Sequence, residues 1–354
     1  MTHKSFRVPR AFLIAATAIA VSAATGIAPA RVPQDSAPEK SPLELLDVQG
    51  RVDMLVGAGA NITIQLGDDA VVLVDTGIPQ MSPQVLAAIR TLSQKPIEFI
   101  INTSVDPDHT GGNHNLSQSG HFISGMNGET PGASIVSQIA VLDRMTAPSS
   151  SDPKESYAPQ ELWPTDTYDN DRWALFNDEA IVLDHPHAAH TDGDSLVFFR
   201  RSDVISAGDV FTPDRYPMLD LAKGGSIHGE IDALNGLIEM MVPRADEEGG
   251  TYVIPGHGRI CDRNAVTNYR DMVTIIGDRV ADDVKKGMTL DQVKASRPTL
   301  DYDGIYGTNS GPWTTEMFIE AVYKNLRAAN AKSQPSEAAR KPTKSSSKYS
   351  EKNP

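Results

Sequence analysis

The stretch Asn102-Thr103-Ser104-Val105-Asp106-Pro107-Asp108-His109-Thr110-Gly111-Gly112-Asn113 crowds two acids and a histidine into one loop. Residues 97–101 before it form a nearly unbroken apolar run, which is too short for a helix and predicts a buried strand. Ionisable side chains at the end of a buried strand are costly unless they bind something, and Asp106, Asp108 and His109 suit a metal. The loop alone leaves a second interpretation open, an Asp-rich turn that caps the next helix.

Length and composition bound the class of protein. The chain has 354 residues, enough for one large domain or two small ones, and 40% of them are hydrophobic, so a sizeable core is expected. The net charge of −14 argues against a nucleic-acid surface and against binding to anionic lipid. We therefore expect a small-molecule substrate and no nucleic-acid partner, and the oligomeric state stays open. Cys261 is the sole cysteine, which excludes an intramolecular disulfide and a thiolate zinc cluster.

Residues 1–30 have the pattern of a signal peptide. Lys4, Arg7 and Arg10 form a positive segment, residues 11–28 carry no charge, and Ala28-Pro29-Ala30 offers small residues at a cleavage site. We predict cleavage and a periplasmic or secreted protein with no membrane attachment afterwards. An uncleaved anchor is the alternative, because the apolar stretch approaches the length that spans a bilayer.

The rest of the chain alternates short apolar strands with amphipathic helices, which is typical of the α/β class. We predict strands at 51–56, 62–66, 71–74, 97–101, 181–183, 196–200, 204–206 and 252–254, and helices at 82–93, 135–145, 231–241, 264–286, 290–295 and 314–329. Residues 146–178 are rich in Pro, Ser and Asp and are expected to form a long surface loop.

These patterns predict an organisation in five parts. They are a signal peptide (1–30), a linker (31–45), a main domain (46–275), a carboxyl-terminal helical extension (276–331) and a disordered tail (332–354). The tail is assigned to disorder because it is rich in Lys, Ser and Pro and has few apolar residues.

Four separate loops, each after an apolar strand, carry potential metal ligands. They are Asp106, Asp108 and His109 in the first loop, His190 in the second, Asp209 in the third and His257 in the fourth. Each loop has a glycine beside or near the key residue, and glycine permits the close approach of backbone that a metal site needs. One histidine after a strand is more often a satisfied polar residue than a ligand, but four such loops in one chain favour a metal centre.

Other polar residues near these loops have plainer interpretations. Asp75 follows the strand at 71–74, and we interpret it as a structural turn acid and not as a ligand. Asp192 and Asp194 either bind the ligands through hydrogen bonds or belong to a tight turn. Arg215, Tyr216 and Lys223 follow Asp209 in a long loop, where they either receive an anionic group or are simply solvated.

The sequence resembles the metallo-β-lactamase-fold hydrolases, a superfamily that also contains glyoxalase II-like thioesterases and ribonucleases. The resemblance rests on Gly57-Ala58-Gly59-Ala60-Asn61, Val74-Asp75-Thr76-Gly77, the loop quoted first, Ala189-His190-Thr191-Asp192-Gly193-Asp194, Ala207-Gly208-Asp209 and Pro255-Gly256-His257-Gly258, in the family's order and spacing. It covers roughly residues 46–275. It implies an αβ/βα four-layer sandwich, in which two mixed sheets lie face to face with helices outside, and a site along one edge. Residues 288–293 and 318–326 also resemble the carboxyl-terminal helices of periplasmic hydrolases in this superfamily.

The first loop departs from the family pattern. The family's loop reads His-x-His-x-Asp-His, and the same positions here are Ser104, Asp106, Asp108 and His109. In the family the two leading histidines and the one that matches His190 hold a first zinc, so that position keeps His190, the bridging Asp209 and the substitute Asp106. Asp108, His109 and His257 match the ligands of a second metal, and this set is complete.

The implied cofactor is a divalent metal. Zinc is the family's ion, and iron or manganese are alternatives because three carboxylates and three imidazoles favour a harder ion. A hydroxyl such as that of Ser104 is a poor zinc ligand. We therefore expect one ion to bind firmly and a second to bind weakly or not at all.

The resemblance implies an exported metal-dependent hydrolase that uses a metal-activated water, with Asp108 as both ligand and catalytic residue. The family's substrates include esters, thioesters, lactams and related small molecules, and no spacing in this sequence chooses among them. The alternative is a non-catalytic ligand-binding member of the fold, which Ser104 and Asp106 favour. A metal oxidoreductase like the family's di-iron branch is a third interpretation, favoured by Asp106 but weakened because no flavin-binding domain follows.

Overall fold

The computed structural model describes residues 43–124, 128–149, 157–246 and 249–333. The predicted signal peptide, the linker before residue 43 and the tail beyond residue 333 lie outside these ranges. Within them, no helix has both the length and the apolar character needed to cross a bilayer.

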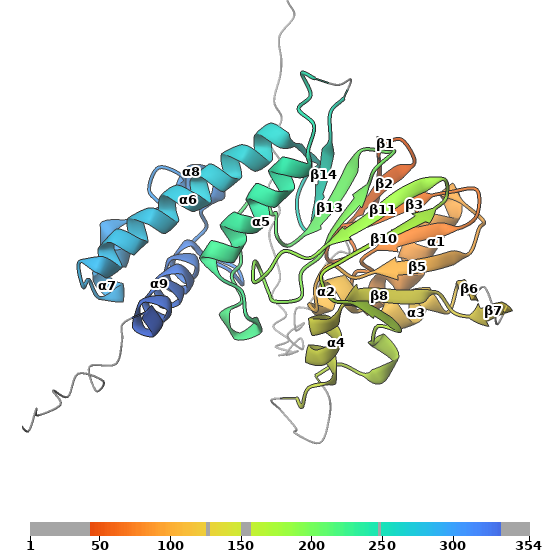
Figure 1. The fold of residues 1–354 in the computed structure, drawn as a ribbon, viewed down its shortest axis with the longest axis horizontal. Coiled ribbons are helices and arrows are strands. Elements are labelled where there is room, and N and C mark those ends of the chain that lie inside the picture. Colours follow the sequence, from red (N-terminus) through yellow and green to blue (C-terminus); the bar gives the residue numbers. More distant parts are fainter. Residues whose placement is uncertain (1–42, 125–127, 150–156, 247–248, 334–354) are drawn as a thin grey trace, which may run out of the picture. The chain divides into compact units, whose positions relative to one another are not determined.

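Two large mixed sheets form the centre of the fold (Figure 1). The seven-stranded sheet has the order β1-β2-β3-β4-β5-β8-β9, with β1 (Glu44–Gln49), β2 (Val52–Val56), β3 (Ile62–Leu66), β4 (Val71–Val74), β5 (Ile97–Ile101), β8 (Ser134–Gln138) and β9 (Asp166–Tyr168). The six-stranded sheet has the order β10-β11-β12-β13-β14-β15, with β10 (Asp171–Phe176), β11 (Glu179–Asp184), β12 (Leu196–Phe199), β13 (Val204–Gly208), β14 (Tyr252–Pro255) and β15 (Cys261–Asp262). A separate two-stranded sheet pairs β6 (His121–Ser124) with β7 (Gly128–Pro131).

The helices connect these strands and follow the last one. The α-helices are α1 (Ser82–Leu92), α2 (Pro107–Thr110), α3 (Asn113–Ser117), α4 (Ile139–Thr146), α5 (Ile227–Met240), α6 (Arg263–Lys285), α7 (Leu290–Ser296), α8 (Asp303–Tyr306) and α9 (Thr315–Ser333). The 3-10 helices are η1 (Pro79–Met81), η2 (Gln160–Leu162) and η3 (Leu221–Lys223).

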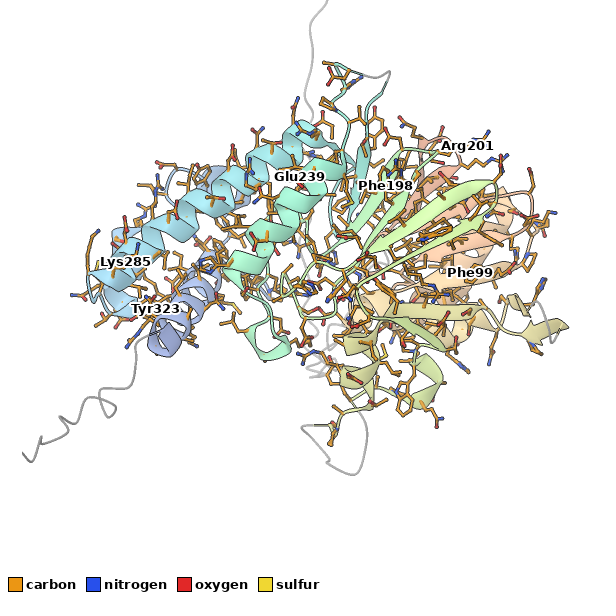
Figure 2. The ribbon with its side chains drawn as sticks, in the orientation of Figure 1. Phe99, Phe198, Arg201, Glu239, Lys285 and Tyr323 are labelled. Atoms are coloured by element: carbon orange, nitrogen blue, oxygen red, sulfur yellow. The ribbon has the colours of Figure 1, made fainter. Side chains whose placement is uncertain are left out.

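Alternating side chains explain why these elements stack in four layers. Val72 of β4 and Val197 of β12 belong to the buried cluster between the two sheets. Leu73 points to the other face of its sheet, because successive side chains of a strand alternate, and it packs with Ile89 of α1. Phe198 likewise points away from the sheet interface and packs in the cluster that includes α5, α6 and α9 (Figure 2). The αβ/βα sandwich expected from the sequence is therefore confirmed.

The carboxyl ends of several strands meet at one edge. β4 and β5 pair in parallel, as do β13 and β14, so the loops after each pair leave on the same side. β11 runs in the direction of β13, because both pair antiparallel with β12. The loops that carry all the predicted ligands follow β5, β11, β13 and β14, so topology alone draws them to one region.

Two predictions of local structure are wrong. The helix predicted at 135–145 is a buried strand, β8, followed by the helix α4, because residues 134–136 pair in parallel with β5. The loop predicted at 146–178 contains β9 and β10, and β10 forms a hairpin with β11. The hairpin turn is Asn177-Asp178, in which both residues have positive φ, 55° and 58°, a conformation that Asn and Asp adopt more readily than most residues.

Three of the predicted domain limits fall inside regular elements, and one of them, residue 331, lies within α9, which ends at Ser333. β1 begins at Glu44, within the segment expected as a linker. α6 runs from Arg263 to Lys285 and so passes residue 275, where the main domain was expected to end. Its neighbours α5 and α9 pack in the same buried cluster, so the carboxyl-terminal helices share a core with the second sheet (Figure 1).

The side chain of Asn177 connects the two sheets and provides a test of this packing. Its Nδ2 donates to Gln65 Oε1 of β3 (2.6 Å), and its Oδ1 accepts from the backbone N of Ala70 (3.2 Å). We expect Asn177→Gly to lower the free energy of unfolding by about 2 kcal/mol, because buried polar groups lose their partners while glycine accepts the positive φ. Urea denaturation followed by circular dichroism measures the change.

Asp178→Gly is the matched control. It also introduces glycine, at the neighbouring position of the turn, where the side chain is exposed and pairs with exposed Arg201. An exposed ion pair contributes about 1 kcal/mol or less, so this variant should be nearly as stable as the parent. Equal losses in the two variants would contradict the role given to the amide.

Candidate metal centre

The six predicted ligands lie together in two groups. The first cluster is Asp106, His190 and Asp209, and the second cluster is Asp108, His109 and His257; within each, the potential ligand atoms lie within 4.8 Å of one another. Asp108 and His257 are half-buried, and the other four are buried. The structure thus brings together every residue predicted as a ligand, while the binding of an ion stays a prediction.

The loop after β5 divides its acids between the two clusters. Asp106 has an extended backbone, with ψ of 144°, and Pro107 then begins α2 at the position where proline is favoured. The loop can pack this closely because Gly112 has no side chain, since a Cβ there would lie 2.4 Å from the carbonyl oxygen of Thr76. Ser104 is buried, and its Oγ accepts from the backbone N of Asp106 (3.2 Å), which is a turn contact.

Ligand atoms of the second cluster face one another at short range. His257 Nε2 lies 3.1 Å from Asp108 Oδ2 and 3.7 Å from Asp209 Oδ1. His109 Nε2 lies 3.5 Å from Asp209 Oδ2. Asp209 therefore stands between the two clusters, and the bridging role that the family resemblance implies for it stays a prediction.

Two buried atoms of this region have no hydrogen-bond partner among the described residues: His109 Nε2 and Asp209 Oδ1. Buried polar atoms are nearly always paired, and an imidazole nitrogen beside a carboxylate is the donor set of zinc and related divalent ions. The residues present therefore fit a divalent ion at the second cluster.

Asp75 fixes the orientation of His109. Asp75 Oδ2 lies 2.8 Å from His109 Nδ1, and the same carboxylate accepts from the backbone N (2.8 Å) and the Oγ1 (2.6 Å) of Thr103. Nδ1 thus donates to Asp75, which leaves Nε2 directed at the cluster, the arrangement found behind many metal-binding histidines. Burial lowers the pKa of His109, but the charges of Asp75 and Asp209 outweigh it and raise that pKa well above its ordinary value. The interpretation of Asp75 as a turn acid that bonds a neighbouring loop is confirmed.

The first cluster, in contrast, is internally paired. His190 Nδ1 donates to the carbonyl oxygen of Met218 (2.6 Å), and its Nε2 lies 2.8 Å from Asp106 Oδ2. Burial opposes a charge on either partner, yet their hydrogen bond and mutual attraction raise the pKa of His190 to about 10 and hold that of Asp106 well below its usual range. In the metal-free chain the pair is an imidazolium and a carboxylate.

Lys223 is the main member of the site whose role the sequence did not define. Its Nζ lies 2.5 Å from Asp106 Oδ1 and 2.9 Å from Asp220 Oδ2. Two roles were expected for it, an anion receptor or a solvated loop charge, and the structure shows a half-buried lysine bonded to a predicted ligand. Tyr216, grouped with it, is buried and hydrogen-bonded to Thr299 and Asp303, away from the clusters.

Asp192 and Asp194 have structural partners of their own. Both oxygens of Asp192 bind the guanidinium of Arg144, at 2.6 and 2.5 Å. Asp194 accepts from the backbone N (2.8 Å) and Oγ1 (2.6 Å) of Thr191, as a turn acid does. Burial raises the pKa of Asp194 to about 6. The contacts of Asp194 are those of the turn interpretation, whereas Asp192 forms an ion pair with an arginine of α4.

Sequence reasoning also missed Glu230, a buried acid on α5. Neither of its carboxyl oxygens has a hydrogen-bond partner within the described part of the chain, and burial raises its pKa well above the ordinary value. A signal was available, since Glu230 lies on the apolar face of the helix between Ile227 and Leu234.

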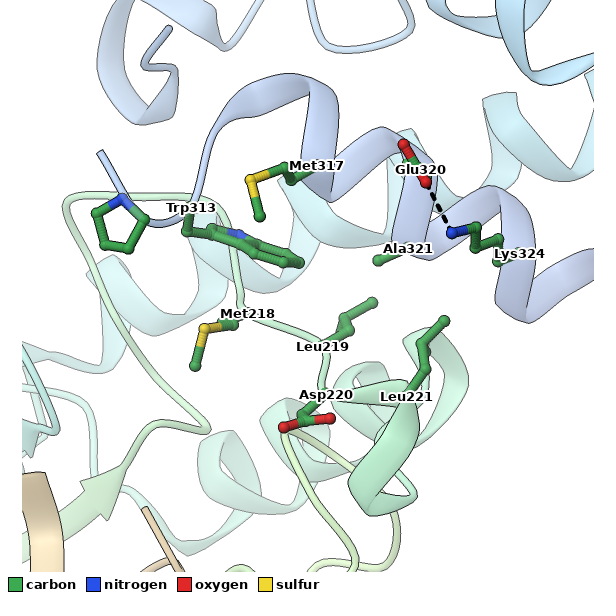
Figure 3. Close-up of a pocket in the computed structure, with 10 residues that line it drawn as sticks. Met218, Leu219, Asp220, Leu221, Trp313, Met317, Glu320, Ala321 and Lys324 are labelled. Atoms are coloured by element: carbon green, nitrogen blue, oxygen red, sulfur yellow. Dashed lines mark ion pairs between the residues drawn. The ribbon is translucent and has the colours of Figure 1, made fainter. Parts of the chain in front are cut away.

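A cavity of about 460 Å³ lies behind the first cluster (Figure 3). One wall is the segment 218–221, which also supplies the carbonyl of Met218 to His190 and the carboxylate of Asp220 to Lys223. The opposite wall includes Trp313 and Met317, from the start of α9 and the residues before it.

Comparison with known families identifies one match. A family model described as the metallo-beta-lactamase superfamily matches residues 56–257, which is more than half of the chain. The match contains all six predicted ligands. No curated protein matches the chain.

Solved structures of low sequence identity have a similar fold. A metallo-beta-lactamase from Pontibacter korlensis is 16% identical, over 66% of this chain and 99% of that one, with a TM-score of 0.49. The DIM-1 metallo-beta-lactamase is 16% identical, over 66% and 98%, with a TM-score of 0.50. The stereoselective inverting sec-alkylsulfatase Pisa1 from Pseudomonas sp. is 14% identical, over 83% and 52%, with a TM-score of 0.57, so this chain spans about half of that protein. At these identities the likeness concerns the fold alone.

The pairing of His190 predicts how the stability of the metal-free protein depends on pH. Its pKa is about 10 in the fold against an ordinary 6.5, so its contribution is complete below pH 6.5 and is lost as the pH rises toward 10. We expect the free energy of unfolding of chelator-treated protein to fall across this range, with a contribution from His190 on the order of 1 kcal/mol per pH unit. Urea denaturation at pH 6.5, 8 and 9.5 measures it.

Two variants isolate this contribution. His190→Asn removes the titrating ring and should flatten the pH dependence of the unfolding free energy. His228→Asn, at an exposed histidine of α5, should leave it unchanged. If His190→Asn retains the parent's slope, the imidazolium assignment is wrong.

Proposed function

Because the chain belongs to the metallo-beta-lactamase superfamily, we propose that it is a metal-dependent hydrolase whose ion binds at the second cluster. The observation that carries the proposal is the pair of buried atoms, His109 Nε2 and Asp209 Oδ1, that have no hydrogen-bond partner among the described residues. A divalent cation between them would satisfy both and would add Asp108 and His257 as further ligands. Zinc is the ion of the family, and the carboxylates make iron or manganese alternatives.

The ion would supply one part of the chemistry, the Lewis acidity that polarises a substrate oxygen and acidifies water. The chain supplies the rest. Burial opposes the charge of Asp108, but its hydrogen bond to His257 and the neighbouring His109 lower its pKa, so it is a carboxylate at neutral pH. A carboxylate beside the reacting water orients it and accepts its proton. The side chains of Asp108 and His257 are 35% and 20% exposed, so water and substrate reach this side of the site.

The proposed substrate is a small ester, thioester, lactam or related molecule. The acidic net charge of −14 supports a small molecule over a nucleic acid. The pattern of residues 1–30 supports export, and we propose a periplasmic or secreted protein; the mass of the mature chain recovered from its host checks this. Sulfate esters belong in a substrate panel, because the inverting sec-alkylsulfatase is among the structures with a similar fold.

Metal content is the first test. Mature protein reconstituted with zinc, iron or manganese should retain about one equivalent after gel filtration. Asp108→Ala and His257→Ala should each release it, because each removes a proposed ligand. Elemental analysis that finds only trace metal in the reconstituted parent would contradict the proposal.

Turnover is the second test, and it separates the enzyme from a ligand-binding member of the fold. The parent should hydrolyse at least one member of a panel of ester, thioester, lactam, phosphodiester and sulfate ester substrates. Asp108→Asn should lose about 10²-fold or more of that activity. Substrate binding without turnover by metal-loaded protein would favour the non-catalytic alternative, which Ser104 and Asp106 support.

Asp75 provides a further prediction that does not depend on turnover. Asp75→Asn keeps an oxygen that accepts a hydrogen bond from Thr103. It replaces the oxygen that accepts from His109 Nδ1 by an amide NH2 group, which is a donor, so His109 should bind the metal ion less tightly. We expect metal affinity to fall by about 10- to 100-fold, measured by competition with a chromophoric chelator. Asp47→Asn, the same change at an exposed residue of β1, is the control and should bind metal as the parent does. Unchanged affinity in Asp75→Asn would exclude the positioning role.

A further inference from the structure

Lys223 brings a permanent positive charge into the first cluster. Its Nζ lies 2.5 Å from Asp106 Oδ1, while the other oxygen of that carboxylate lies 2.8 Å from His190 Nε2. Both oxygens of Asp106 therefore have a partner within the chain. His190 is equally committed, because its second ring nitrogen donates to Met218.

The two clusters differ in how completely their ligand atoms are hydrogen-bonded within the chain, although Asp108 and His257 of the second cluster also lie 3.1 Å apart. At the second cluster, His109 Nε2 and Asp209 Oδ1 have no hydrogen bond within the described residues. Their ion-pair contacts are long, 3.5 Å from His109 Nε2 to Asp209 Oδ2 and 3.7 Å from His257 Nε2 to Asp209 Oδ1. In the first cluster, Asp106 and His190 bond to each other, and Lys223 completes the set. Ligand atoms that lack a hydrogen-bond partner attract a cation. The ligand atoms of the first cluster already have a cation beside them, the ammonium of Lys223.

The backbone holds Lys223 in this place. Asp220 Oδ1 accepts from the backbone N of Ala222 (3.0 Å) and of Lys223 (3.1 Å), which closes the turn of η3. The carbonyl oxygen of Lys223 accepts from the backbone N of Asp192 (2.8 Å), next but one to His190. The turn that carries Lys223 is therefore hydrogen-bonded to the loop that contains His190. The side chain of Lys223 is only 20% exposed.

The charges in the cluster disfavour a divalent ion beside this lysine. An ion that shared Asp106 would stand close to the ammonium, in a partly buried site where like charges repel strongly. It would also have to displace the hydrogen bond between Asp106 and His190. The first cluster contains two carboxylates. Asp209 also faces the second cluster, and the charge of Asp106 is already balanced by Lys223.

We propose that the ammonium of Lys223 is the resident cation of the first cluster, so that the protein binds one metal ion, at the second cluster, and not two. The proposal rests on the proposed function for the ion at the second cluster. To that function the proposal adds the identity of the group that occupies the first cluster and the reason why one metal ion binds per chain. Lys223 is a positioning residue in this account, because it fixes Asp106 and excludes a second ion.

Removal of the charge should open the first cluster to metal. Lys223→Met and Lys223→Gln are both neutral, and the glutamine can still donate to Asp106. After reconstitution with excess zinc and gel filtration, the parent should retain about one equivalent and each neutral variant about two. Elemental analysis gives the content, and titration calorimetry gives the number of binding events. Circular dichroism checks that each variant is folded.

Two control variants separate charge from any other effect of the substitution. Lys223→Arg keeps a cation and should retain one equivalent. Lys294→Met alters a lysine of similar exposure that also pairs with two carboxylates, Glu316 and Glu320, in the carboxyl-terminal helices. It should likewise leave the content at one.

Each outcome decides a specific point. One equivalent in the parent and two in either folded neutral variant, with one in both controls, supports the proposal. Two equivalents in the parent, or one in the parent and one in both neutral variants, overturns it and leaves the metal-dependent function standing. If only one neutral variant folds, its content decides. No retained metal in the parent contradicts the proposed function itself.

Discussion

The contact between Asp75 and the loop after β5 is the interaction on which the candidate metal centre depends. Asp75 directly follows β4, is 1% exposed and has a positive φ of 63°. Its carboxylate must therefore be paired inside the protein. It binds the backbone and hydroxyl of Thr103 and the ring of His109. One buried charge therefore fixes both the path of the loop and the tautomer of a proposed ligand. The fold and the site are coupled at this residue.

The same requirement, that buried charges be paired, divides the site into unequal halves. Asp209 lies between the clusters, and the nearby histidines outweigh its burial and hold its pKa well below the usual range. On one side the chain supplies its own cation, the ammonium of Lys223, through a turn bonded to the His190 loop. On the other side His109 Nε2 has no hydrogen bond within the described residues, and its contact with Asp209 Oδ2 is 3.5 Å long. The difference between the two clusters therefore arises because one loop contributes the ammonium of Lys223 to the first cluster. The types of ligand in the two clusters do not explain it alone.

The ligands were predictable because their positions follow from local patterns that repeat. Each follows an apolar strand, and parallel pairing of β4 with β5 and of β13 with β14 carries such loops to one edge. The role of Lys223 was not predictable in this way. It lies 117 residues from Asp106 in a loop without periodicity, and only the folded turn at η3 brings the two together. The strand β8 was missed for a related reason, since its pairing with β5 is non-local while its sequence runs directly into a helix.

The two clusters differ in how far their side chains are exposed to solvent. Asp106 and His190 are 5% and 0% exposed, and the cavity behind them is walled off by the segment 218–221. Asp108 and His257 reach solvent, so a substrate that approaches the site meets the second cluster first. A lysine ammonium has fixed hydrogen-bond partners and no exchangeable coordination positions, whereas a metal ion accepts and releases oxygen ligands. In the proposed enzyme, bond rearrangement would therefore take place at the second cluster, and the first cluster would hold Asp106 and Asp209 in place and contribute a constant charge.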